Sequence, residues 1–288
     1  MPALIDLRHR IKSVRNTQQI TQAMKSVATA KFKKAQRTVL EGRPYWHHSP
    51  ELAAAVLAAA QRSSHPLLEK RPEKKIQVLV VTSDKGLAGA FNSNLLESTH
   101  KFLQEKQERC DIRLSLLGKK AAQFFKRLDY GIDLSLVDRV QKLEEQEIRE
   151  LARELMRDYV LNRTDAVYIA YNEFKSILAP RVTIAPLLPL QPPYETPAGS
   201  EVSDWEPGAE SFLRTLLPRY FEDQVCHCVY ESIAAEHAAR MMAMDNATNN
   251  AEELIDDLTL VLNKIRQASI TKELLEIISA VEALAKNR

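Results

Sequence analysis

The fold is decided by the stretch HAARMMAMDNATNNAEELIDDLTLVLNKI, residues 237–265. Apolar or small side chains recur along it in alternating steps of four and three residues. They are His237, Met241, Met244, Thr248, Ala251, Ile255, Leu258, Leu262 and Ile265. This spacing is a heptad seam, which predicts a helix packed along a second helix. The seam resumes one residue out of phase at Ile270, Leu274, Ile277, Val281 and Leu284, which predicts a local change in the supercoil.

The partner helix is expected at the other end of the chain. Residues 209–288 contain no glycine and residues 1–57 contain only Gly42, so both ends lack the residue that most often terminates helices. The N-terminal segment carries a rougher seam, formed by Leu4, Leu7, Ile11 and Val14 and then by Ile20, Met24 and Val27. At about 1.5 Å per residue, a helix of roughly 70 to 80 residues at the C-terminus would reach about 105 to 120 Å.

The middle of the chain, residues 73–190, has a different pattern. Short β-branched runs begin at Ile76, Asp111, Ala166 and Arg181, and helical stretches are expected at residues 93–108, 119–128 and 143–162. Apolar strands that alternate with helices predict a mainly parallel sheet in an α/β domain, followed by a proline-rich loop at residues 191–208. The predicted fold is therefore α/β, with a long antiparallel coiled coil of the terminal helices and a Rossmann-like globular foot.

Charge is unevenly distributed although the net charge is only +2. In the first 45 residues, two acids oppose ten basic residues, which are Arg8, Arg10, Lys12, Arg15, Lys25, Lys31, Lys33, Lys34, Arg37 and Arg43. This segment would attract an acidic protein partner, or it is simply a solvated basic face. The overall charge does not indicate a nucleic-acid partner.

The sequence offers few groups for redox or metal chemistry. Cys110, Cys226 and Cys228 form an odd count without the spacing of a disulfide framework, which fits a reducing compartment. No metal site is expected, because residues two apart on a helix point in different directions and no second pair of ligands is nearby. The longest apolar run, residues 52–60, is too short to cross a bilayer, and the N-terminus lacks a signal-peptide core.

One segment could bind a nucleotide. SDKGLAGAFN, residues 83–92, lies between the first strand and a helix, where α/β proteins bind phosphate. Its glycines are spaced as GxxG, and Lys85 precedes the turn, so it matches neither common phosphate-binding motif. The alternative is a structural turn or protein contact. No catalytic residues and no cofactor are predicted, since no Ser-His-Asp or Cys-His arrangement can be assigned.

Two segments closely resemble the ATP synthase gamma subunit family. They are RHRIKSVRNTQQITQAMKSVATAKFKKAQ at residues 8–36 and RMMAMDNATNNAEELIDDLTLVLNKIRQASITKELLEIISAVEAL at residues 240–284. SDKGLAGAFN is also similar to that family's turn after the first strand. The resemblance implies a non-catalytic rotor shaft in the central stalk of a proton-translocating ATP synthase. Such a shaft couples ion flow to ATP synthesis in the alpha/beta ring and regulates ATPase activity.

The resemblance also implies contact residues. Arg266 and Gln267 match the pair that bonds acidic loops of the beta subunit, and Met24 and Lys25 are expected to approach a beta subunit as well. An apolar tip that turns in a hydrophobic sleeve is expected at Leu274, Ile277, Ile278, Val281 and Leu284. Trp205 and Glu206 resemble a motif that meets the c-ring.

The implied partners are the alpha and beta subunits, the epsilon subunit and the membrane c-ring, with one copy of the chain per complex. The implied location is the cytoplasmic face of a bacterial inner membrane, as a peripheral protein. Two other interpretations remain open. One is a free-standing α/β nucleotide-binding enzyme with helical oligomerisation arms, and the other is a coiled-coil adaptor with an inert foot.

Overall fold

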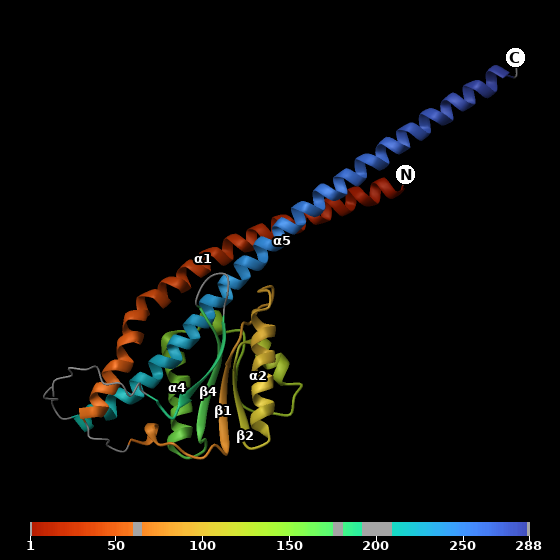
Figure 1. Ribbon diagram of the computed structural model, residues 1–288. Coiled ribbons are helices and arrows are strands. Elements are labelled where there is room, and N and C mark those ends of the chain that lie inside the picture. The colour runs from red at the N-terminus through yellow and green to blue at the C-terminus, as the bar shows by residue number, and fades with distance from the viewer. Residues whose placement is uncertain (1, 60–64, 175–180, 192–208, 287–288) are drawn as a thin grey trace. The chain divides into compact units, whose positions relative to one another are not determined.

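The structure is a computed structural model that describes residues 2–59, 65–174, 181–191 and 209–286 (Figure 1). The chain divides into two units, one formed by Met1–Val27 with Met242–Arg288 and the other by Ala28–Met241. The elements in chain order are α1 (Pro2–Ala59), η1 (Pro66–Leu68), β1 (Lys75–Val81), α2 (Phe91–Gln107), β2 (Asp111–Leu117), α3 (Lys119–Phe125), β3 (Gly131–Leu136), η2 (Val140–Lys142), α4 (Glu145–Val160), β4 (Ala166–Glu173), β5 (Arg181–Leu188) and α5 (Ala209–Lys286).

The two terminal helices are long and uninterrupted. Helix α1 has 58 residues and α5 has 78 residues, and α5 continues through Pro218 near its start. Few glycines lie in either segment to end the helix early. The predicted fold class, long terminal helices combined with an α/β domain, is confirmed.

The α/β domain contains a five-stranded sheet in the order β3-β2-β1-β4-β5. Strand β1 pairs in parallel with β2 and β4, and β2 pairs in parallel with β3. Strand β5 runs antiparallel to β4 and closes one edge. Strand β3 at the other edge is absent from the prediction. Its residues are exposed or only partly buried, so it lacks the apolar run that marks β1.

Helices cover both faces of the sheet, and Figure 1 shows α2 and α4 on opposite sides. Alternate residues of a strand point to opposite faces, so Val78 packs with α2 and α3 whereas Leu79 packs with α4 and the first part of α5. Both faces are therefore buried, which explains why β1 is apolar almost throughout.

In the first unit, α1 and α5 pair in antiparallel orientation. Met244, Thr248 and Ala251 of the predicted C-terminal seam are buried, with exposed fractions of 4%, 8% and 8%. One part of the predicted α1 seam is wrong, because Ile20 and Val27 are 60% and 57% exposed.

The physical reason is the phase of the heptad. Steps of four and three from Leu4, Leu7, Ile11 and Val14 lead to Gln18, Thr21, Lys25 and Ala28, and these four side chains are buried or partly buried. The α1 seam therefore keeps its heptad period along the helix. After Val14 its positions are occupied by polar or small residues instead of large apolar ones.

Candidate functional site

The turn segment at residues 83–92 leads from β1 into the first residues of α2. It lies at the carboxyl edge of the sheet, next to the point where the strand order reverses. Its first and last residues, Ser83 and Asn92, are hydrogen-bonded to each other. The Asn92 side-chain oxygen accepts a hydrogen bond from the Ser83 backbone N–H at 3.1 Å, and the Ser83 hydroxyl donates to the Lys85 carbonyl at 2.7 Å. These bonds fix the turn against the end of β1.

Asp84 joins this turn to two other loops. One of its carboxylate oxygens accepts hydrogen bonds from the backbone N–H groups of Lys119 and Asp138, at 3.0 and 2.9 Å. The other accepts from the N–H of Val140 at 3.0 Å. The loops after β1, β2 and β3 are therefore fastened together by one side chain.

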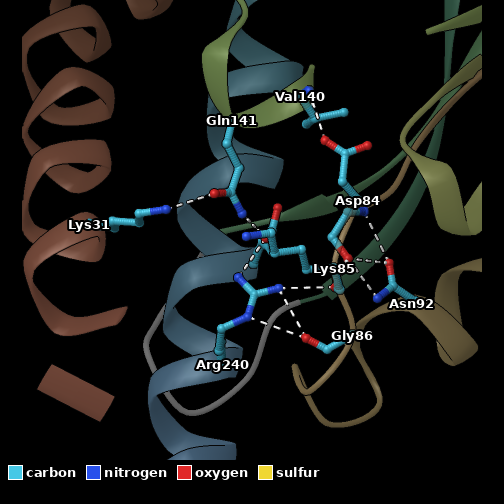
Figure 2. A network of polar contacts seen from close by, with 10 residues as sticks. Lys31, Asp84, Lys85, Gly86, Asn92, Val140, Gln141 and Arg240 are labelled. Atoms are coloured by element: carbon cyan, nitrogen blue, oxygen red, sulfur yellow. Dashed lines mark hydrogen bonds and ion pairs between the residues drawn. The ribbon is translucent and has the colours of Figure 1, made fainter. Parts of the chain in front are cut away.

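Helix α5 is bound to the same turn through Arg240, as Figure 2 shows. The Arg240 guanidinium donates to the carbonyl oxygens of Lys85, at 3.1 Å, and Gly86, at 3.3 Å, and pairs with Glu236 at 2.6 Å. Gln141 donates to Glu236 at 3.0 Å and accepts from Lys31 of α1 at 2.7 Å. This clamp, formed by Lys31, Gln141, Glu236 and Arg240, connects α1, η2, α5 and the turn.

The clamp is buried at its centre. Glu236 is 1% exposed and Arg240 is 8% exposed. Burial raises the pKa of Glu236, and the charge and hydrogen bond of Arg240 oppose that rise. On the next residue, burial lowers the pKa of His237 to about 4, and Arg240 and Lys31 add to the effect. His237 is therefore neutral at pH 7.

The sequence allows the turn to be either a nucleotide-binding segment or a structural turn, and its contacts distinguish the two. A phosphate cradle requires backbone N–H groups directed at the ligand. Here the Lys85 and Gly86 carbonyls face a guanidinium of the same chain, and Asp84 places a carboxylate at the edge of the sheet. The observed contacts of the turn are thus those of a structural junction.

The residues expected to contact the beta subunit lie in the first unit, at two levels of the coiled coil. Lys25 Nζ lies 2.6 Å from the Asp245 carboxylate, and Met24 is partly buried. Arg266 and Gln267 are both exposed on α5. They lie about 20 residues beyond Asp245, or roughly 30 Å along the helix. The structure therefore does not bring the two pairs together.

The predicted apolar tip is exposed as far as its side chains are described. Leu274, Ile277 and Ile278 are 55%, 61% and 53% exposed. The side chains of Val281 and Leu284, like the whole of Trp205 and Glu206, lie outside the described residues.

The described part of the chain shows no group of three or more His, Cys, Asp or Glu side chains that could hold a metal ion. Cys226 and Cys228 are buried, which raises the pKa of each thiol to about 12. Over the same residues, no helix combines the length and apolar content needed to cross a membrane.

The chain has long terminal helices, and an α/β domain lies between them in the sequence. At the carboxyl ends of the strands, the turn contacts the chain's own helix α5. These features define a coiled-coil protein with an inserted α/β domain.

A family model described as ATP synthase matches residues 3–284. The ATP synthase gamma chain of Pelotomaculum thermopropionicum is 41% identical over 285 residues, covering 99% of this chain and 100% of that one. That of Anaeromyxobacter dehalogenans is 45% identical over 294 residues, with the same coverage. This chain belongs to the ATP synthase gamma chain family.

Solved structures with the same fold come from mitochondrial ATP synthases. A chain in the Euglena gracilis OSCP/F1/c-ring structure matches with a TM-score of 0.66 and 20% identity, covering 98% of this chain and 95% of that one. A chain in the Tetrahymena thermophila central stalk/c-ring structure matches with a TM-score of 0.63 and 23% identity, covering 79% and 99%. At these identities the likeness shows the fold alone.

Proposed function

We propose that this chain is the rotor shaft of a proton-translocating ATP synthase and carries no catalytic site of its own. It couples ion flow through the membrane sector to ATP synthesis in a ring of alpha and beta subunits, and it regulates ATP hydrolysis there. Family membership supports the general role.

The end of α5 carries this assignment. Figure 1 shows that α5 continues as a single helix beyond the start of α1. Its apolar side chains Ile270, Leu274 and Ile277 are 50%, 55% and 61% exposed. A single exposed apolar helix is unfavourable in water and favours a surrounding partner surface. Apolar contact has no directional preference, so such a helix can turn within a sleeve.

Asymmetry of the first unit supports the coupling mechanism. Exposed basic residues lie on α1, at Arg8, Arg10, Lys12 and Arg15, and exposed acidic residues lie on α5, at Glu252, Glu253, Asp256 and Asp257. A shaft of this kind presents a different face to each surrounding subunit, so each nucleotide site is held at a different affinity. Rotation by a third of a turn exchanges those affinities, which is a shift of populations driven by differential contacts.

The remaining partners follow from the same proposal. Arg266 and Gln267 would bond acidic loops of a beta subunit, since a guanidinium recognises carboxylates in a bidentate manner. The epsilon subunit and the c-ring would bind the α/β domain, Trp205 and Glu206 meeting the c-ring. One copy would serve each complex, at the cytoplasmic face of the bacterial inner membrane.

Coexpression with candidate alpha and beta subunits tests the proposal. The expected product is a complex of three alpha chains, three beta chains and one copy of this chain, with an ATPase rate that depends on its presence. Failure to join the ring would contradict the proposal. Nucleotide binding by the isolated chain that is lost in Lys85→Ala would favour the enzyme interpretation instead.

A further inference from the structure

A polar layer joins α1 to α5. It is formed by Thr21, Lys25 and Thr248 at seam positions and by Asp245 beside the seam. The two threonines are 9% and 8% exposed, and their hydroxyl oxygens lie 2.8 Å apart. About one helical turn away, Lys25 and Asp245 form an ion pair of 2.6 Å, and their side chains are 35% and 34% exposed. Both contacts join α1 to α5 within the first unit.

The hydroxyl protons of the layer are fully used when the two threonines face each other. Thr21 Oγ1 lies 3.0 Å from the Gln18 carbonyl oxygen, and Thr248 Oγ1 lies 2.7 Å from that of Met244. Each hydroxyl has one proton to donate. One proton therefore goes to a carbonyl of its own helix, and the other crosses to the opposite threonine.

Both contacts specify the same register. Lys25 lies four residues after Thr21, and Asp245 lies three residues before Thr248, as expected for contacts one helical turn apart between antiparallel helices. A slip of one helical turn, about 5.4 Å, would move Lys25 from Asp245 to Thr248 or Met242. Apolar layers tolerate such a slip because their contacts are non-directional. The polar layer does not, because its charge and hydroxyl groups would lose their partners.

We propose that these four side chains are positioning residues that lock the register of α1 and α5, so that torque on one helix reaches the other without slippage. This inference rests on the proposed rotor function and assigns the charge of Lys25 to the contact between α1 and α5. A polar residue at a seam position is an established way to specify helix register.

A charge swap tests the lock in the assembled complex. Lys25→Asp and Asp245→Lys each place like charges together, whereas the double variant restores an opposite pair. In inverted membrane vesicles, we expect each single variant to lower the protons pumped per ATP hydrolysed by up to about fivefold, and the double variant to recover most of that loss. The control is Lys33→Asp, an exposed position on the same helix, which should behave as wild type.

Register is read directly by a cysteine pair. In a Cys110→Ser background, Thr21→Cys and Thr248→Cys should cross-link readily on oxidation. Adding Lys25→Asp should lower the yield, and adding Asp245→Lys as well should restore it. An unchanged yield, or a charge swap as impaired as Lys25→Asp alone, would overturn the lock and place Lys25 at a partner surface. A wild-type chain that does not support pumping contradicts the rotor function instead, and the cross-link yield of the chain still decides the lock.

Discussion

At the scale of single residues, replacing Arg240 tests whether its ion pair with Glu236 stabilises the fold. Arg240→Ala leaves the nearly fully buried Glu236 without its counter-charge and leaves two carbonyls of the turn without their donor. Breaking a buried pair costs about 3 to 5 kcal/mol, so we expect a loss of this size in the free energy of unfolding. Urea unfolding of the purified chain, followed by circular dichroism, measures it.

Arg37→Ala is the matched control, because Arg37 pairs with Glu41 on the same helix and both side chains are exposed. It should change the stability far less than Arg240→Ala. A loss for Arg240→Ala as small as that of an exposed pair would contradict a stabilising role of the clamp.

His237 predicts a specific pH dependence. Its pKa falls from 6.5 to about 4 on folding, through burial and through the nearby cations Arg240 and Lys31. Between these two values the unfolded chain binds a proton that the folded chain does not, so stability falls as the pH falls from about 6.5 towards 4. From pH 7 to pH 5 the wild type should lose about 2 kcal/mol more than His237→Gln. Urea unfolding at both pH values checks this, and identical losses would contradict it.

At the scale of elements, the β2–α3 junction depends on Gly118. Its φ is 98°, and a Cβ atom there would lie 2.3 Å from the Thr82 carbonyl oxygen. Gly118→Ala should therefore destabilise the chain by about 2 to 4 kcal/mol, through backbone strain and this clash. At Gly86 the nearest atom to such a Cβ is Lys120 Cε at 3.8 Å, so Gly86→Ala should stay within about 1 kcal/mol of wild type. Thermal unfolding of the two variants compares them, and equal melting temperatures would refute the argument.

Sequence periodicity predicts the elements that carry a β-branched run or a heptad repeat. The β-branched runs predict strands β1, β2, β4 and β5, and the heptads with the scarcity of glycine predict the terminal helices. Strand β3 was missed because an edge strand with exposed residues carries a weak apolar signal. Apolar identity alone points to Ile20, whereas the heptad phase leads to the polar Thr21, which is the buried residue.

The clamp could not be predicted from sequence. Arg240 and the Lys85 carbonyl are 155 residues apart, and a backbone carbonyl leaves no mark on residue identity. Only the fold brings them together. The polar layer is different, since continuing the α1 seam in steps of four and three from Val14 would have placed Thr21 and Lys25 in it.

At the scale of the whole molecule, Arg266→Ala should uncouple the complex without altering its nucleotide sites. A charge-assisted contact contributes about 1.5 to 3 kcal/mol, so its removal should weaken the binding of α5 to the beta subunit at least about tenfold. ATP-driven pumping should fall accordingly, while nucleotide affinity stays unchanged. Lys272→Ala, which removes another exposed cation of α5, is the control. Wild-type pumping by Arg266→Ala would count against the assigned contact.

Rotation of the chain itself is the most direct test of its role as a shaft. With the alpha/beta ring fixed to a surface and Cys110 replaced by serine, a bead attached at Glu105→Cys, an exposed position of α2, would report the motion. We predict ATP-dependent rotation in one direction, with pauses at every third of a turn. A bead that stays still while the same complexes hydrolyse ATP would contradict the account.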